Sequence, residues 1–416
     1  MLITIVIAFV TLGDGIPPNA TEVVPPWTCL VCGAGGGADA LLNVALFVPL
    51  GAALFGAGVG RGRSLLLCIT ASAAIEVAQA TVIPFRYPAL GDVVWNGVGG
   101  GLGVLAAAAG RRLVLPDPQR AASFAWWAVG GFSVVMALTV AAFRPVLPSG
   151  HYQIRDFHRC VPSSIDRGPW LVDFEYGDVV VRRGDLVPRA SLEGAWREGA
   201  LRVSGHTNPS SCEDIQSLVS FTSGLPDEIA ALSRSLTSVS FRVRLRAIDL
   251  RLRQPSVIVP VDYVALYGEA SAPVEGRYVK GRLSVAYEGR ADVRRSELWL
   301  SPGLGWALLY PFAEALHLGI TWMNFVWISL LTLPIGYFMM ASLAGGDAPI
   351  APTTGDAGRV VAVQVVLVGA VLLVAGWVTV RQVMPVELVA ALAGLALGAG
   401  AARLARAIAP AWSTGA

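Results

Sequence analysis

Long apolar runs separated by short polar segments dominate both ends of the chain. A helix that crosses the roughly 30 Å hydrocarbon core of a bilayer needs about 20 apolar residues. Seven such runs lie at residues 40–60, 64–84, 92–110, 121–143, 318–343, 360–380 and 388–408. A shorter run at 2–12 lacks the basic start and cleavage site of a secretory signal, so we count it as an uncleaved span, with a cleaved signal as the open alternative. The pattern predicts a multi-pass α-helical membrane protein with about eight spans.

Two further patterns lie between and beside these runs. From Ser238 to Arg253 apolar and polar residues alternate, which predicts one half-buried strand. Shorter strand-like runs separated by turn residues lie at 179–181, 201–203, 218–221, 257–259, 264–267, 283–287 and 298–300. Many short strands predict an all-β sandwich of jelly-roll type over residues 144–302. The aromatic stretch 306–316 predicts an interfacial helix leading into the next span.

Composition and charge support this division of the chain. Of the 416 residues, 54% are hydrophobic and 14% are charged, whereas soluble domains have about 25% charged residues. Basic and acidic residues number 6 and 6 in residues 1–143, 21 and 19 in 144–302, and 4 and 4 in 303–416. The chain therefore reads as a transmembrane region (1–143), a water-soluble domain (144–302) and a second transmembrane region (303–416). The balanced charge of the middle region gives no reason to expect nucleic acid, and the expected surroundings are membrane lipids.

Basic residues in short loops predict the orientation, because Lys and Arg favour the cytoplasmic side. Three loops that share one side carry most of them: Arg61 and Arg63; Arg111, Arg112 and Arg120; Arg403 and Arg406. Only Arg86 and Arg381 fall on the other side. We expect a bacterial inner-membrane protein with cytoplasmic N- and C-termini and an extracytoplasmic middle domain.

The cysteines fit an oxidising compartment for that side. A disulfide between Cys160 and Cys212 is the leading candidate in the middle domain. Cys29 and Cys32 have the spacing of a zinc or redox pair, but no second pair follows, so a local disulfide or free thiols is the simpler interpretation. The histidines of the middle domain, His151, His158 and His206, have no metal-ligand spacing, so neither a metal nor a cofactor is expected.

Polar residues interrupt the second to fourth runs at helical spacing. They are Asp39 and Asn43; Ser72, Glu76 and Gln79; and Asp92 and Asn96. Residues three or four apart share a helix face, and Gly99 and Gly103 continue the last face, where small residues let helices approach closely. With the orientation above, all three faces converge near the outer ends of their helices.

A carboxylate in the bilayer is costly unless it is paired or hydrated. We therefore expect an outward-facing polar pocket in which Glu76 or Asp92 pairs with Arg86 and bonds to Asn43, Gln79 and Asn96. Purely architectural hydrogen bonds between helices are the alternative. No nucleophile with an adjacent base is evident, so no catalytic residue is assigned and an enzyme is not the favoured interpretation.

The ordered motif resembles the VanZ-like family of membrane proteins. It reads N-x3-F-x-P-L-G from Asn43, S-x3-E-x2-Q from Ser72, and R-x5-D-x3-N-x3-G from Arg86, within residues 38–108. The family is named for a protein that raises resistance to the glycopeptide antibiotic teicoplanin, and other members accompany envelope or exopolysaccharide genes. The resemblance implies that Asn43, Glu76, Gln79, Arg86, Asp92 and Asn96 are the family's polar positions. Residues 86–91 are less polar than in many members.

After a VanZ-like region, the middle domain is similar to laminin-G or concanavalin A-like sandwiches, on the strand order around Phe174, Gly177, 199–204 and 236–258. Such folds bind carbohydrate or protein. The E-x-D-x-x-E-like run of a glucanase of this fold is missing, so hydrolysis is not expected. The arginines on one face of the predicted strand indicate a face exposed to solvent; the alternative is a patch that binds phosphate or uronate groups.

Three functions remain open at this point. The first is binding of an envelope glycan or lipid-linked cell-wall precursor by the β-sandwich and the polar pocket. The second is a membrane enzyme or transporter in exopolysaccharide or cell-wall metabolism that uses Glu76 or Asp92 as proton acceptor. The third is a structural anchor. Charge-poor spans near the C-terminus speak against an ion-coupled transporter.

Overall fold

The computed structural model describes residues 26–413 except 34, 84–87, 157–170, 174–179, 183, 199, 208–215, 224–227, 236, 262–271, 290–292, 311–318, 344–355, 381 and 383. Within the described residues, seven helices are long and apolar enough to cross a membrane. They are α2 (Gly36–Gly56), α3 (Arg61–Thr81), α4 (Leu90–Val114), α5 (Pro118–Ala142), α9 (Ile320–Leu343), α10 (Asp356–Val380) and α11 (Pro385–Ser413). Each overlaps one predicted span, which confirms the multi-pass helical class, whereas the predicted span at 2–12 lies outside the described residues.

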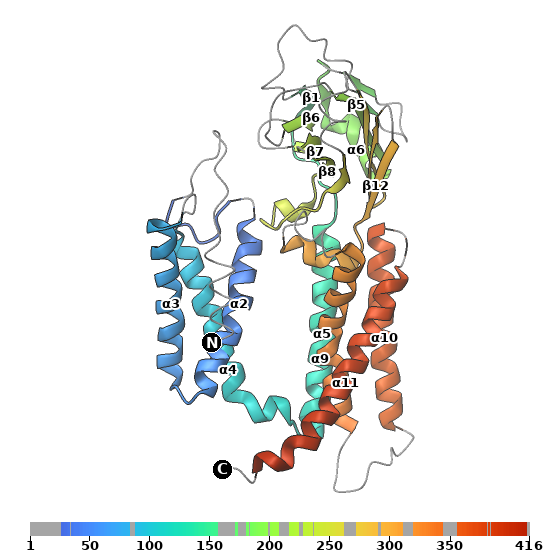
Figure 1. The fold of residues 1–416 in the computed structure, drawn as a ribbon. Helices are drawn as coiled ribbons and strands as arrows, with labels where there is room; N and C mark the ends of the chain where they lie inside the picture. The colour runs from blue at the N-terminus through green and yellow to red at the C-terminus, as the bar shows by residue number, and fades with distance from the viewer. Residues whose placement is uncertain are drawn as a thin grey trace.

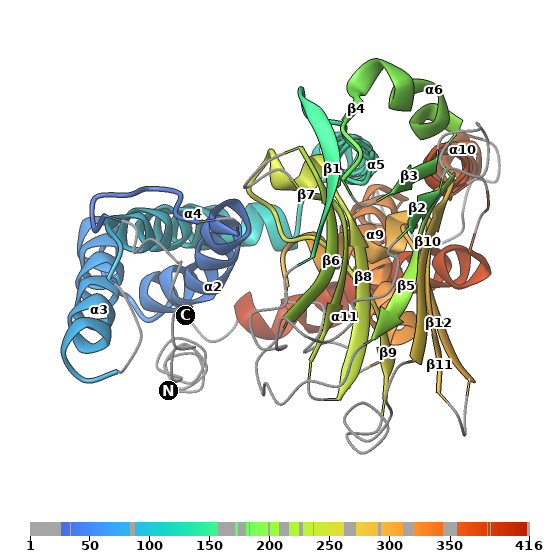
Figure 2. The ribbon, with the colours of Figure 1, turned by 90° about the horizontal axis from the view of Figure 1, so that it is seen from above.

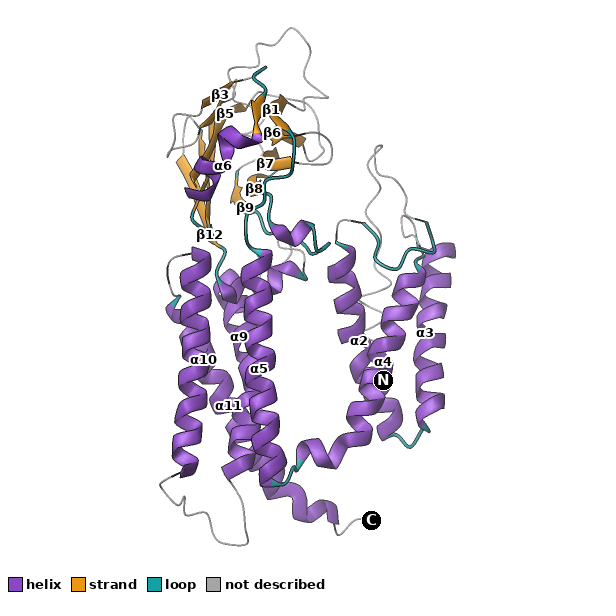
Figure 3. Cartoon of the chain, turned by 180° about the vertical axis from the view of Figure 1, so that it is seen from behind, coloured by secondary structure: helices purple, strands orange, loops and turns teal. Residues whose placement is uncertain are grey.

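The helices form two bundles that stand side by side (Figures 1 and 3). Helices α2, α3 and α4 pack together, and α5, α9, α10 and α11 form the second bundle. Glycines allow the closest crossings: a Cβ on Gly103 of α4 would lie 2.0 Å from the Val48 carbonyl oxygen of α2, and one on Gly336 of α9 would lie 2.1 Å from that of Leu395. Backbones therefore touch directly in each bundle, as small residues permit in membranes.

The middle of the chain folds into two antiparallel sheets that face each other above the second bundle (Figures 1 and 2). One sheet has the order β4-β1-β6-β7-β8-β9 and the other β12-β11-β10-β5-β2-β3. The strands are β1 (His151–Asp156), β2 (Leu171–Asp173), β3 (Val180–Arg182), β4 (Val187–Pro188), β5 (Ala200–Thr207), β6 (Gln216–Thr222), β7 (Glu228–Arg234), β8 (Ser238–Val243), β9 (Val257–Pro260), β10 (Ala272–Val279), β11 (Arg282–Glu288) and β12 (Val293–Trp299). Buried residues of both sheets form one core, in which the Phe241 ring lies where a Cβ on Gly276 would stand. A short helix, α6 (Arg189–Glu198), which the sequence pattern did not predict, lies beside the sheets.

The long strand predicted from Ser238 to Arg253 is wrong in its second half. Strand β8 ends at Val243, and a 3-10 turn, η1 (Arg246–Ile248), follows. The Arg246 amide bonds to the Arg144 carbonyl and the Leu245 amide to the Gln254 side chain, so the backbone leaves the sheet. Apolar and polar residues continue to alternate past Val243, but from Leu245 onward the backbone groups of these later residues no longer pair with a neighbouring strand of the sheet. The predicted strand at 264–267 lies outside the described residues.

The β domain and the second bundle share a hydrophobic core. Ala142 and Phe143 at the end of α5, Leu304 and Trp306 after β12, and Val380 at the end of α10 all belong to the core cluster of the sheets. The interfacial helix predicted at 306–316 stays a prediction, because residues 311–316 lie outside the described residues. At its described start, residues Pro302–Leu308 form a 3-10 turn, η2, in which Trp306 is 4% exposed. The Trp306 indole donates to Asn324 Oδ1 of α9 at 2.8 Å, so the start of this segment packs against α9.

Candidate functional site

The first bundle gathers polar side chains at the end that faces the β domain. Helices α2 and α4 begin at this end and α3 finishes there (Figure 1). The polar cluster, as we define it, consists of Asn43 on α2, Ser72, Glu76 and Gln79 on α3, and Asp92 and Asn96 on α4. Four of these side chains are buried: Ser72, Glu76, Gln79 and Asn96. The helical spacing therefore brings together the residues that the sequence analysis placed on converging faces.

Hydrogen bonds join the cluster across all three helices. The Asn43 amide donates to Asp92 Oδ1 at 2.7 Å, which ties α2 to α4. The Asn96 amide donates to Ser72 Oγ at 2.8 Å, which ties α4 to α3. Glu76 Oε2 accepts the backbone N–H of Ala89 at 2.8 Å, just before α4 begins. The carboxylate of Glu76 thus positions the loop that leads into α4.

One buried polar atom of the cluster has no partner among the described residues. Asn96 is 3% exposed, and its Oδ1 accepts no hydrogen bond there. An unsatisfied buried polar atom costs about 1–3 kcal/mol. Because most buried polar atoms in native proteins have a hydrogen-bond partner, such an exception calls for an explanation. The predicted ion pair with Arg86 falls outside the described residues, so it stays a prediction.

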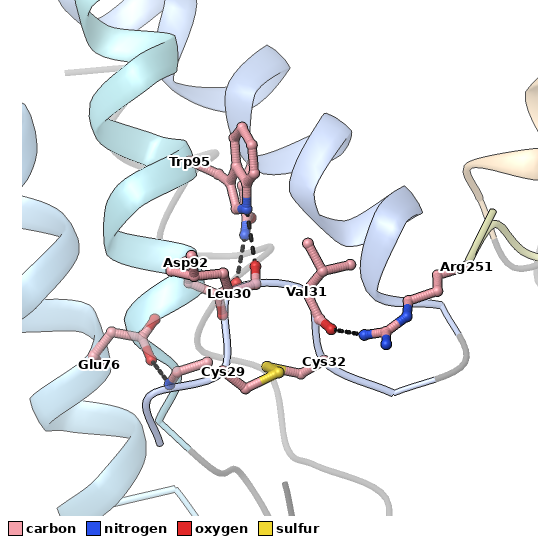
Figure 4. Close-up of a disulfide and its surroundings, with 10 residues drawn as sticks. Cys29, Leu30, Val31, Cys32, Glu76, Asp92, Trp95 and Arg251 are labelled. Atoms are coloured by element: carbon pink, nitrogen blue, oxygen red, sulfur yellow. Dashed lines mark hydrogen bonds between the residues drawn. A yellow bond between two sulfur atoms is a disulfide. The ribbon is translucent and has the colours of Figure 1, made fainter. Parts of the chain in front are cut away.

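A disulfide loop, residues 26–33, covers this end of α4 (Figure 4). Cys29 and Cys32 form a disulfide, the local alternative that their spacing left open. The Leu90 amide donates to the Trp27 carbonyl at 2.8 Å, and the Trp95 indole donates to the Leu30 carbonyl at 2.9 Å. The loop therefore holds the first turn of α4, next to Asp92. The other predicted pair, Cys160 and Cys212, lies outside the described residues.

A turn of the β domain reaches the same place. We call residues 249–253, which follow η1, the arginine turn. Arg253 forms an ion pair with Asp39 at 2.8 Å, and the Arg251 guanidinium donates to the Val31 carbonyl of the disulfide loop (Figure 4). Asp39 and Asn43 are four residues apart on α2, so the β domain contacts α2 one helical turn from the polar cluster. Sequence analysis missed this contact because 214 residues separate Arg253 from Asp39.

Two other arginines of the predicted strand face, Arg242 and Arg244, pair within the β domain. Arg242 bonds to Glu228 at 2.6 Å and Arg244 to Asp249 at 3.1 Å. These pairs fit the solvated face rather than an open anion patch. Over the described ranges no group of three or more His, Cys, Asp or Glu residues is placed to hold a metal ion.

Comparison with known proteins bears on the region of the polar cluster. Residues 6–111 match the family model VanZ/LLP1, which includes α2, α3 and most of α4. No curated protein and no solved structure matches the chain. The match ends before the β domain, whose likeness to laminin-G and concanavalin A-like sandwiches stays a prediction. The comparison supports a VanZ-like membrane region at the N-terminal end of this multi-pass protein and links it to the cell envelope.

Proposed function

We propose that this protein binds a glycolipid or lipid-linked glycan of the bacterial cell envelope. In this proposal the polar cluster holds the part of the ligand nearest the membrane, and the β domain binds the glycan that extends from it. The observation that carries the proposal is that the β domain touches α2 at Asp39, one turn from Asn43. One ligand that enters the cluster from that side therefore also meets the β domain.

The chemistry of the cluster suits hydroxyl-rich head groups. Carboxylates accept hydrogen bonds and side-chain amides both donate and accept them, which is how sugar hydroxyls are held. A ligand hydroxyl near Asn96 would satisfy the buried Oδ1 that has no partner in the described part of the chain. The bonds that Glu76 and Asp92 accept, from Ala89 and Asn43, give both carboxylates a positioning role. This favours binding over the alternative in which either residue is a proton acceptor.

The expected orientation agrees with this role. Helices α3 and α5 begin, and α11 ends, at the side of the bundles far from the β domain (Figure 1). By sequence position, Arg63 and Arg120 belong to the first turns of α3 and α5, and Arg403 to the last part of α11. By the rule that short cytoplasmic loops are rich in Lys and Arg, we place that end in the cytoplasm and the β domain outside the inner membrane. Altered sensitivity to glycopeptide antibiotics would follow if the bound ligand is a cell-wall precursor.

The test is binding by the full chain in lipid nanodiscs. The probes are a polyprenyl-diphosphate-linked disaccharide and the same disaccharide without its lipid. We expect Glu76→Gln to weaken binding of the lipid-linked probe at least tenfold, with an unchanged melting temperature. Glu193→Gln, on the exposed face of α6, is the matched control and should bind as the unaltered protein does. Equal binding by both variants would contradict the proposal.

A further inference from the structure

The disulfide loop lies between the first bundle and the β domain and bonds to both. On the bundle side, the Leu90 and Gly91 amides at the start of α4 donate to the Trp27 and Cys29 carbonyls at 2.8 and 3.1 Å. A Cβ on Gly91 would lie 2.5 Å from the Leu30 carbonyl oxygen, so the two backbones are in direct contact. The first turn of α4, which carries Asp92, is therefore held by the conformation of this loop.

On the other side, the same loop meets the arginine turn at the start of α2. The Arg251 guanidinium donates to the Val31 carbonyl, and the Arg251 carbonyl accepts the Gly37 and Ala38 amides at 2.8 and 3.3 Å. The first amides of a helix have no partner within the helix, so the β domain supplies one here. Gly37 is required for this approach, because its Cβ would lie 2.7 Å from the Leu250 carbonyl oxygen.

We propose that the Cys29–Cys32 disulfide is a redox-sensitive fastening that keeps the β domain docked on the VanZ-like bundle. The bond closes the loop on both sides of Leu30 and Val31, whose carbonyls bind α4 and Arg251 respectively. Opening it gives this backbone more freedom, so the Leu30 and Val31 carbonyls are no longer held where they accept from Trp95 and Arg251 at the same time. Both cysteines are only partly buried, which leaves the sulfur atoms open to attack. The proposal concerns docking and does not depend on what the polar cluster binds.

The chemistry is thiol–disulfide exchange with a dithiol reductant. One thiolate of the dithiol attacks a sulfur of the pair, which breaks the Cys29–Cys32 bond and forms a mixed disulfide. The second thiol of the reductant then displaces the remaining cysteine. Cys29 and Cys32 end as two thiols, and the dithiol ends as a disulfide, so two electrons and two protons pass to the protein. Cys68, a free and fully buried cysteine, takes no part.

The experiment is amide hydrogen exchange of the full chain in nanodiscs, with and without dithiothreitol. Cys68, Cys160 and Cys212 are replaced by serine, so that dithiothreitol can reduce only one disulfide. We expect reduction to speed exchange at least tenfold at Gly37 and Ala38 and at Leu90 and Gly91, while the amides of β8 and β11 in the sheet core stay unchanged. The further double variant Cys29→Ser/Cys32→Ser should exchange fast without reductant.

Two results would overturn the proposal. One is a mass spectrum of the protein kept free of reductant in which Cys29 and Cys32 are free thiols. The other is a result in which reduction speeds exchange only within residues 26–33 and leaves Gly37 and Ala38 protected. The disulfide would then stabilise the loop alone and would not keep the β domain docked. If the double variant Cys29→Ser/Cys32→Ser does not fold, the comparison of exchange rates with and without dithiothreitol tests the proposal by itself.

Discussion

The sharpest prediction concerns the glycine crossing of α2 and α4. A Cβ on Gly99 would lie 2.2 Å from the carbonyl oxygen of Val44. The nearest comfortable C···O approach is about 3.3 Å. The obstacle is backbone, so a side-chain rotation cannot relieve it. Gly99→Ala must therefore push the two helices apart by about 1 Å at Val44, next to Asn43.

The expected cost follows from two opposing terms. Overpacking a close contact costs about 1–3 kcal/mol, whereas exchanging Gly for Ala within a helix gains about 0.5–1 kcal/mol. We expect Gly99→Ala to lose about 1–2 kcal/mol of stability on balance. The 2.7 Å bond from Asn43 to Asp92 would also lengthen beyond hydrogen-bond range, because it spans the same crossing.

Gly101 on the same helix is the matched control. Its Cβ would meet only Leu65 Cδ1, at 3.8 Å, which is an ordinary contact. Gly101→Ala should therefore be neutral or stabilising by up to about 1 kcal/mol. The assay is unfolding of purified protein in detergent, followed by intrinsic fluorescence. Equal melting temperatures for the two variants would refute the close crossing and the geometry of the polar cluster that depends on it.

Three further predictions test other parts of the molecule. Glu387→Ala removes the acceptor of the buried Gly303 amide at 2.7 Å, so it should cost about 1–3 kcal/mol in the same unfolding assay. Burial raises the pKa of Tyr278 to about 12; the unfolded chain therefore ionises first, and stability should fall as pH rises from about 10 to 12, less so in Tyr278→Phe. With the native cysteines replaced, a membrane-impermeant thiol reagent applied to intact cells should label Ser191→Cys on exposed α6 but not Gly62→Cys at the start of α3; the reverse would place the β domain in the cytoplasm.

The helices were predictable because each depends on a property of its own segment. Apolar length is sufficient to identify a span, and for α5 local capping also explains where the helix starts. Asp117 accepts the Arg120 amide at 3.0 Å and Pro118 occupies the first turn of α5, which is a start signal visible in the sequence. The polar faces of α2, α3 and α4 were predictable for the same reason, because a spacing of three or four sets a helix face whatever the partner.

The contacts between distant segments were not predictable in this way. The arginines from Arg242 to Arg253 follow one pattern in the sequence but make different contacts. Arg242 pairs within the sheets, Arg251 bonds to the disulfide loop, and Arg253 pairs with Asp39 on α2. The difference arises because the chain leaves the sheet after Val243, and the positive φ of Arg251, 53°, turns it toward α2. A period of two contains no information about that departure. Likewise the spacing of Cys29 and Cys32 allowed a disulfide but could not show what the loop holds.

The weakness of the ion pair at the docking site explains why the loop conformation matters. Arg253 and Asp39 are 34% and 49% exposed, and an exposed pair of this kind contributes at most about 1 kcal/mol. Arg251 then provides most of the described polar contacts at the docking site, through its carbonyl with the Gly37 and Ala38 amides and through its guanidinium with the Val31 carbonyl. The backbone groups on both sides of these contacts are positioned by the path of the chain. That path is set on one side by the turn after η1 and on the other by the disulfide loop. The loop also holds α4 beside Asp92, so a change in its conformation reaches the β domain and the polar cluster together.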